Sequence, residues 1–213
     1  MQAPDRETRA RLLDVARTLF AARGYREVTV REICSAARAN VAAINYHFGD
    51  KFGLYREVID EAIIIMRQTS QDAEAAGEGQ DAEGRLRAFI SVFLQRVGRN
   101  QDSWIRQLFT HEMAEPTEAF DDVITKVIEP RMHYLQTLVA EILGSELDDE
   151  RVLRCAVSVQ FQFQAAMANP VSRRLAPGYI GTPGAVERLA QHIADFSLGG
   201  IRSLRDAERA TDE

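Results

Sequence analysis

Apolar side chains recur at intervals of three and four residues along nearly the whole chain, and this spacing most constrains the fold. An early example is a set that would line one face of a helix: Leu12, Val15, Ala16, Leu19 and Phe20. The same period returns in the later segments, and no segment shows the alternation of a half-buried strand. The sequence therefore predicts an all-α chain, with three short helices first and five or six longer helices after them.

Helix start and stop signals divide the first part of the chain. Gly24 ends the first helix, because glycine adopts the left-handed conformation at little cost. The segment 29–32 has the Thr-x-x-Glu pattern of a capping box and opens a short second helix. Asn40 is a suitable N-cap for a third helix that ends near His47. Lys51 then begins a long helix.

Later signals predict where the longer helices begin and end. Thr117 is expected to cap one helix, and Pro130 is expected to kink or split the pattern that follows. Thr182 and Pro183 suit the N-cap and the first position of the last helix. We expect that helix to end near Arg205.

The charges are distributed unevenly. The formal net charge is -6, which by itself argues against a protein that binds nucleic acid. Residues 1–56, however, hold ten basic and six acidic side chains, whereas the remaining 157 residues hold 16 basic and 26 acidic ones. This asymmetry indicates that the first segment meets a polyanion, although a chance clustering of solvated charges would give the same numbers.

The second and third predicted helices have the proportions of a helix-turn-helix, in which the second helix of the pair enters the major groove of DNA. Ile44 and Phe48, four residues apart, would hold this helix to the core. Small side chains at its start would let the backbone approach the bases: Val41, Ala42 and Ala43. Asn45, Tyr46 and His47 would then occupy the exposed end, where their polar groups can donate to phosphates or base edges.

Residues 9–59 resemble the DNA-binding domain of the TetR family of transcriptional regulators. Three runs carry the resemblance: Leu19-Phe20-Ala21-Ala22-Arg23-Gly24-Tyr25, Thr29-Val30-Arg31-Glu32-Ile33 and Asn45-Tyr46-His47-Phe48-Gly49-Asp50-Lys51. The resemblance implies that one set of residues faces the bases or the groove rim: Asn40, Val41, Ala42, Ala43 and Asn45. It implies that a second set holds phosphates: Thr29, Tyr46, His47 and Lys51.

The turn between these two helices departs from the family pattern. Arg38 stands where the family usually has glycine, and Ala39 stands where it usually has valine. A left-handed Arg38 would cost about 1 kcal/mol, unless the turn has a different shape. Its guanidinium would equally suit a phosphate contact.

The rest of the chain is expected to dimerise and to bind a small-molecule effector. The segment 152–167 is apolar on more than one side, so that a partner subunit would cover it together with the last helix; the alternative is one large core. The resemblance implies an effector pocket, for which we select Phe93, Trp104, Gln107, His111, His133, Gln160 and Phe163. Arg131 is a further polar candidate, and each of these residues could instead be an ordinary core or surface residue.

Catalysis, metals and cofactors are not expected. His111-Glu112-x-x-Glu115 lacks the second histidine of a zinc protease, and Cys34 and Cys155 are too far apart in sequence to suggest a metal site. No nucleotide-binding or nucleophile-elbow motif is found. The chain also lacks an apolar run that could span a membrane, so we expect a cytoplasmic protein.

The sequence thus predicts a helix-turn-helix DNA-binding domain over 1–56 and a helical effector-binding and dimerisation domain over 57–213. The predicted function is ligand-responsive transcriptional repression, in which a homodimer binds a near-palindromic double-stranded DNA operator. The alternatives are a helical small-molecule-binding protein or enzyme without a role on DNA, and a helical interaction module.

Overall fold

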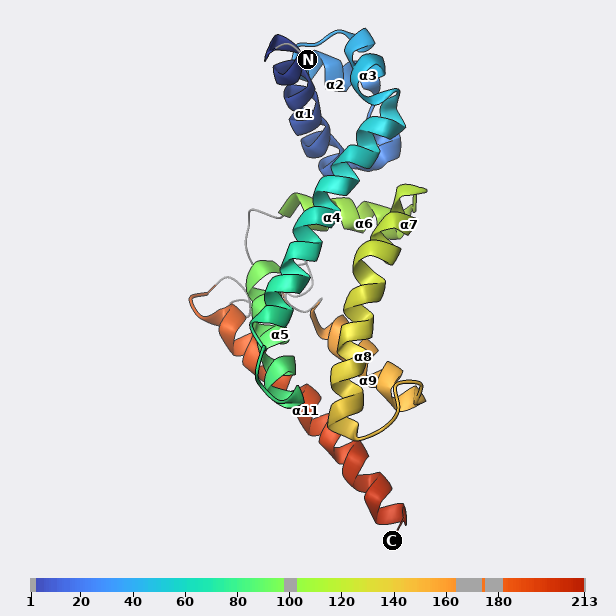
Figure 1. Cartoon of the computed structure of the whole chain (residues 1–213). Coiled ribbons are helices and arrows are strands. Elements are labelled where there is room, and N and C mark those ends of the chain that lie inside the picture. The colour runs from blue at the N-terminus through green and yellow to red at the C-terminus, as the bar shows by residue number, and fades with distance from the viewer. Residues whose placement is uncertain (1–2, 98–102, 164–173, 175–181, 213) are drawn as a thin grey trace. The chain divides into compact units, whose positions relative to one another are not determined.

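The computed structural model describes residues 3–97, 103–163, 174 and 182–212 (Figure 1). Every regular element within these ranges is a helix, which confirms the predicted all-α class. None of the described helices is both long enough and apolar enough to cross a membrane.

Packing divides the chain into two compact units. One consists of Met1–Met66 with Asn100–Val127, and the other of Arg67–Arg99 with Ile128–Glu213. The first unit therefore takes in a segment from the middle of the chain, in addition to the range predicted for the DNA-binding domain. A functional boundary at residue 56 stays a prediction, since a packing unit need not coincide with a functional domain.

The first unit is a helical head built on a small core. It contains α1 (Ala3–Glu27), α2 (Val30–Ala37), α3 (Val41–Phe48), the first part of α4 (Lys51–Ala75), α6 (Ser103–Ala114) and α7 (Ala119–Val123). Helix α1 packs against α2, α3 and α6. The core comprises side chains from several of these helices: Leu12, Phe20, Ile33, Ile44, Leu54, Tyr55 and Leu108. Such a core holds α3 in place while one side of it stays free.

The predicted helix boundaries in the head are confirmed. Gly24 has φ +77° and interrupts α1. Thr29 caps α2 through a complete capping box with Glu32. Asn40 caps α3, because its side-chain oxygen accepts a hydrogen bond of 3.0 Å from the Ala42 N–H. Helix α4 begins at Lys51 as expected.

In the part of the second unit that the structure describes, four helices and the end of α4 pack around a larger core. These helices are α5 (Ala82–Val97), α8 (Glu129–Leu143), α9 (Glu150–Gln162) and α11 (Ala185–Asp212). Helix α11 packs against α5, α8 and α9. The core residues include Leu86, Phe89, Ile90, Leu94, Leu135, Leu138, Val159, Phe163, Ile193 and Ile201.

Two predicted boundaries were wrong. Thr117 does not cap α7, whose N-cap is Glu118, because the Thr117 hydroxyl donates to the buried carboxylate of Glu112 instead. The last helix begins at Ala185 and continues to Asp212, past the predicted end near Arg205. Its polar end is held by Glu208, which accepts hydrogen bonds of 2.6 and 2.8 Å from Arg151 at the start of α9.

Pro130 divides a helical path, as predicted. A π-helical turn, η2 (Ile124–Ile128), comes directly before α8, and Pro130 lies in the first turn of α8. Proline has no N–H and is tolerated there, because the first turn of a helix leaves its N–H groups without intrahelical partners.

Candidate nucleic-acid interface

Helix α3 has one buried side and one exposed side. Ile44 and Phe48 are buried, as predicted from their spacing. On the other side Tyr46 is 75% exposed and Val41 is 43% exposed, and Ala42 and Asn45 are exposed with them. Ala43 is half-buried. The helix therefore presents small side chains at its start, and an amide and a phenol further along, to whatever approaches this side.

The turn before α3 contains Arg38 in the left-handed conformation. Its φ and ψ are 51° and 46°, and its N–H donates to the carbonyls of Cys34 and Ser35 at the end of α2. The first of the two possibilities for this turn is therefore the observed one. Arg38 therefore adopts the left-handed conformation although it has a Cβ, at a steric cost of about 1 kcal/mol.

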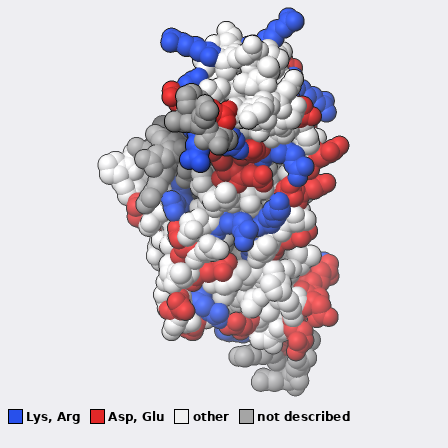
Figure 2. Space-filling view, turned by 45° about the horizontal axis from the view of Figure 1, so that its top comes forward, with Lys and Arg blue, Asp and Glu red and all other residues white. Residues whose placement is uncertain are grey.

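Basic side chains lie around the exposed side of α3. Arg31 on α2 and Arg38 in the turn are both exposed, and among the described residues neither forms an ion pair with a carboxylate. Figure 2 shows long basic side chains projecting outward from the end of the chain that holds α1, α2 and α3. Cations that are free of internal partners are available to an external polyanion.

Thr29 is occupied by its capping box. Its backbone N–H and its hydroxyl donate to Glu32 at 2.8 and 2.7 Å, and its hydroxyl also accepts from the Glu32 N–H. These hydrogen bonds, with a further pair from Arg23, lower the pKa of Glu32 to about 2. The structure thus places Thr29 where it fixes the start of α2, and its predicted phosphate contact stays a prediction.

Lys51 lies at the start of α4, against an aromatic ring. Its ammonium group is 4.2 Å from the centroid of the Tyr25 ring. Partial burial lowers its pKa, and the charge of Glu32 acts in the opposite direction. The side chain remains half-buried, so it is held at the helix N-terminus, where an anion would be favoured.

His47 differs most from its predicted position. Its side chain is 5% exposed, and its Nε2 lies 3.2 Å from the carboxylate of Asp5. The imidazole thus connects α3 to the beginning of α1 and does not lie at the exposed end of the helix. No local sequence pattern predicts this contact, because the two residues are far apart in the chain.

One buried carboxylate of the first unit was not predicted from the sequence. Glu112 on α6 is 2% exposed and accepts hydrogen bonds from the Tyr55 hydroxyl, the Thr117 N–H and the Thr117 hydroxyl. Burial and the carboxylate raise the pKa of Tyr55. His111, the residue before Glu112, lies against Gly24. No group of metal-binding side chains was found among the described residues.

Both parts of the chain match known regulators. Residues 12–58 match the model of the bacterial regulatory proteins of the tetR family. Residues 82–201, more than half of the chain, match the C-terminal domain of the HTH-type transcriptional dual regulator CecR. The chain belongs to the TetR family of transcriptional regulators. The predicted resemblance, which rested on the first part alone, is confirmed.

Two curated TetR-family relatives align with parts of the chain. The HTH-type transcriptional dual regulator CecR of Shigella flexneri is 32% identical over 134 residues, which are 59% of this chain and 60% of that protein. The HTH-type transcriptional repressor KstR2 of Rhodococcus jostii (strain RHA1) is 39% identical over 94 residues, 42% of this chain and 43% of that protein. The chain thus spans well under two thirds of the length of either relative.

Solved structures of the family share the fold. A TetR-like transcriptional regulator from Rhodococcus sp. RHA1 has a TM-score of 0.61 and 19% identity, with 92% of this chain and 96% of that chain covered. A TetR-family transcriptional regulator from Bordetella parapertussis 12822 has a TM-score of 0.65 and 13% identity, with 89% and 93% covered. The arrangement of an N-terminal helix-turn-helix and a helical C-terminal part is therefore confirmed.

The residues selected for the effector pocket of this TetR-family chain belong to both units. Phe93, Gln160 and Phe163 lie in the second unit, where the rings of Phe93 and Phe163 are stacked with centroids 4.6 Å apart. The side-chain oxygen of Gln160 is buried, and no described residue donates a hydrogen bond to it. His133, from the same unit, is exposed.

The other selected residues lie in the first unit. Trp104 packs under the guanidinium of Arg17, which lies 5.5 Å from its ring centroid, and His111 packs against Gly24. Gln107 is exposed. The effector role of all seven residues stays a prediction. Arg131, which was not selected, is the more unusual residue because it is charged and buried.

Helices α9 and α11 of the second unit each expose an apolar stripe. They pack antiparallel, since Arg151 at the start of α9 bonds Glu208 near the end of α11, and Gln162 at the end of α9 bonds Ser197 in its middle. The exposed stripe on α9 is Leu153, Val157 and Phe161, and the stripe on α11 is Phe196, Gly200 and Leu204. Exposed apolar side chains on adjacent helices are typical of a surface that a partner covers.

Proposed function

We propose that the chain is a homodimeric transcriptional repressor that binds a near-palindromic DNA operator through α3 and is released by a small-molecule effector. The exposed side of α3 is the observation that carries this proposal. Repression is supported by the likeness to KstR2, whose name describes a repressor, although CecR is described as a dual regulator.

The residues on α3 suit direct contact with base edges. Val41 and Ala42 are exposed and short, so the helix backbone can come close to the floor of the major groove, and their methyl groups can meet thymine methyls. The Asn45 amide can make two hydrogen bonds to adenine. Tyr46 is exposed at the next position and can donate to a phosphate.

Phosphate contacts would come from cations on both sides of α3. Arg31, Arg38 and Lys51 lie on α2, in the turn and at the start of α4. Contacts of this kind fix the position of a protein on DNA. Each contact also releases counterions from the DNA, which makes binding more sensitive to salt.

The apolar stripes on α9 and α11 support a dimer with two helices from each subunit. Phe196 is 67% exposed and Phe161 is 59% exposed, which is costly for aromatic side chains left in water. Gly200, in line with Phe196, has open space within 4 Å of the point where a Cβ would stand, and would allow a second helix to come close. A two-fold dimer would present two copies of α3 to successive major grooves.

Release by an effector would be a population shift. The dimer would hold its two α3 helices at a spacing that fits DNA, and the effector would bind better to a dimer with another spacing. The effector can weaken operator binding only by its difference in affinity for the two states.

A mobility-shift assay on the DNA upstream of the chain's own gene, in a series of salt concentrations, tests the proposal. We expect a steep salt dependence for the native chain. Lys51→Ala should weaken binding to all sequences and reduce the slope of log K against log salt by about 1. Substitution of Ala42 should change which sequence is preferred.

Lys126→Ala is the matched control, because Lys126 is an exposed lysine of the first unit whose ammonium group pairs with Asp122 at 3.0 Å. It should leave the affinity and the salt slope unchanged. If the native chain showed no preference among duplexes in a selection from a random pool, the alternative of a helical small-molecule-binding protein would replace the proposal.

A further inference from the structure

Arg131 on α8 is a buried arginine in the second unit. It is 6% exposed, its Nε lies 3.4 Å from the hydroxyl oxygen of Ser70, and its guanidinium lies 4.7 Å from the centroid of the Phe93 ring. No carboxylate among the described residues pairs with it. Burial alone lowers its pKa to about 10, so the side chain is still charged near neutral pH. One long hydrogen bond to a neutral hydroxyl leaves most of its five N–H donors unused.

Several other arginines of the same unit are paired. Each forms an ion pair with a carboxylate in the described part of the chain: Arg85 with Glu141, Arg87 with Asp195, Arg96 with Asp72, Arg151 with Glu208 and Arg202 with Glu83. All of these are more exposed than Arg131. Arg131 differs from these arginines in being buried and in having no carboxylate partner among the described residues. Burial of a charge without a counterion is unfavourable, so a further partner is needed.

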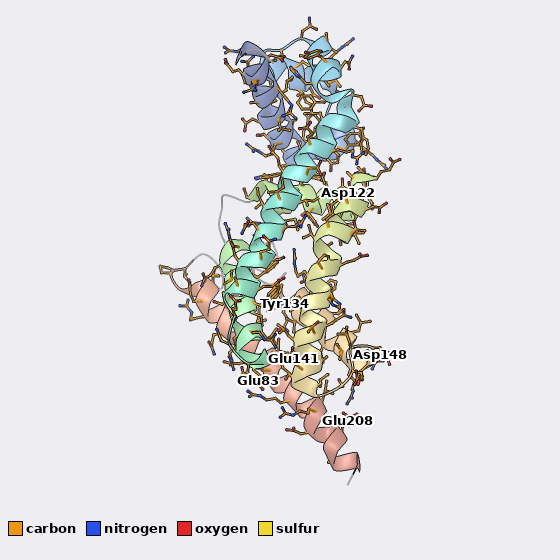
Figure 3. The ribbon with its side chains drawn as sticks, in the orientation of Figure 1. Glu83, Asp122, Tyr134, Glu141, Asp148 and Glu208 are labelled. Atoms are coloured by element: carbon orange, nitrogen blue, oxygen red, sulfur yellow. The ribbon has the colours of Figure 1, made fainter. Side chains whose placement is uncertain are left out.

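An aromatic cluster adjoins the guanidinium at Phe93. Phe93 and Phe163 are stacked, and Phe89 lies 6.0 Å from Phe93 and 5.4 Å from Tyr134, between ring centroids. Figure 3 shows Tyr134 on α8 directed toward α5, the helix that carries Phe89 and Phe93. The cluster is therefore continuous from α5 across α8 to the end of α9.

A buried polar group without a partner among the described residues lies on α9, close to Phe163 in sequence. The side-chain oxygen of Gln160 is buried, and no hydrogen-bond donor reaches it. Gln160 and Phe163 are three residues apart and so lie on the same side of the helical path. Buried acceptors are normally paired, so this oxygen also requires a donor that the described residues do not supply.

We infer that Arg131 and the aromatic cluster form the anion-binding part of the effector site, and that the effector is an organic carboxylic acid with an aromatic or acyl body. The guanidinium binds the carboxylate, and its planar fork matches the two carboxylate oxygens. Phe93 and Phe163 contact the apolar body, and Gln160 accepts a hydrogen bond from a donor on it. This inference rests on the proposed function, because it names the chemical class of the effector.

Acid and amide pairs of the same shape test the charge requirement. Calorimetric titration of the full chain without DNA would compare 6-hydroxy-2-naphthoate with 6-hydroxy-2-naphthamide, and decanoate with decanamide. We expect the acid of at least one pair to bind at least tenfold more tightly than its amide. Arg131→Met should remove this preference and leave binding of the amide unchanged.

Arg87→Met is the control, because Arg87 is an exposed arginine of the same unit that pairs with Asp195. It should keep the preference for the acid. Arg131→Met should also raise the melting temperature of the ligand-free chain, since it removes an unpaired buried charge. Arg131→Lys keeps the charge without the planar fork, and should retain a reduced preference for the acid.

Three results would overturn the inference. These are the absence of any preference for the acid in both pairs, a preference that survives in Arg131→Met, and a lower melting temperature of that variant without ligand. The titrations contain no DNA. A failure of operator binding would therefore appear only in the mobility-shift assay, and the two proposals can fail separately.

Discussion

Arg38 shows how one residue can oppose local backbone preference where a charge is useful. It is the only non-glycine residue with positive φ in the described part of the chain. Glycine would adopt this conformation without the steric cost of a Cβ. The side chain is exposed beside α3, so the strained residue places a cation at the proposed DNA-binding surface.

Arg38→Gly should therefore separate stability from DNA binding. We expect the free energy of unfolding to rise by about 1 kcal/mol, because the strain of a left-handed arginine is removed. Operator affinity should fall, because a phosphate contact is lost. Urea denaturation and the mobility-shift assay measure the two effects.

Arg38→Asn is a suitable comparison, since asparagine tolerates the left-handed region better than most residues and also lacks the charge. It should weaken DNA binding as much as the glycine variant does. A glycine variant that unfolds more easily than the native chain would contradict the strain argument.

Sequence reasoning at this scale succeeded for local interactions. The caps at Thr29 and Asn40 were predicted because each bonds a residue two or three positions further on. His47 could not be placed in this way, since its partner Asp5 comes from the beginning of α1. The need for glycine at position 53 could not be predicted either, since it depends on the fold. A Cβ at Gly53 would lie 1.9 Å from the Phe48 carbonyl oxygen.

At the scale of the elements, α2 depends on the charge of one carboxylate at its start. The pKa of Glu32 is about 2 in the folded chain, below its ordinary value of 4.5, mainly because Thr29 and Arg23 bond the ionised form. The bonds contribute stability at pH values above about 4.5. This contribution is lost as the pH falls from about 4.5 toward 2, where the folded chain also takes up the proton.

Glu32→Gln should reveal this dependence in thermal unfolding. We expect the variant to melt below the native chain at pH 7, and the difference to shrink as the pH falls below 4.5. Asp60→Asn, which changes an exposed carboxylate on α4, provides the comparison and should show no such trend. A difference that stays constant from pH 7 to pH 3 would show that charge is not what the capping box contributes.

Element boundaries were predicted well wherever the signal was local. Pro130 and the capping residues of α2 and α3 were all identified in the sequence. The end of α11 was not, because its polar last turns look like a frayed tail. The ion pair between Arg151 and Glu208 joins residues 57 positions apart, and no local sequence pattern predicts it.

At the scale of the whole molecule, the proposed dimer depends on the apolar stripes of α9 and α11. Phe196→Glu should give single subunits in sedimentation velocity, because a charge would have to be buried at the centre of the interface. Operator affinity should fall with it, since one subunit offers a single α3. Gly200→Leu is a second variant that adds bulk without a charge, at a position that is open in the isolated subunit.

Met113→Glu is the matched control for these variants. Met113 is a 65% exposed apolar residue on α6, away from both stripes in the sequence and in the other unit. It should leave the subunit association unchanged. A Phe196→Glu chain that still sediments as the native species would remove α9 and α11 from the interface.

The sequence predicted the helical class, the family and the face of α3, because these follow from periodicity and short motifs. It could not assemble the proposed effector site. The seven selected residues were chosen for their chemistry along the chain, and they fall into two packing units. The burial of Arg131, and the absence of a carboxylate partner for it in the described part of the chain, could be found only from the fold.

Glu112 connects three segments of the first unit through one buried carboxylate. Its carboxylate joins the first turns of α4, the end of α6 and the backbone at Thr117, all inside the first unit. Sliding of α4 past α6 would leave this buried carboxylate without its hydrogen-bond donors, which is unfavourable. We therefore expect the start of α4, the end of α6 and the backbone at Thr117 to keep their relative positions in any rearrangement of the first unit.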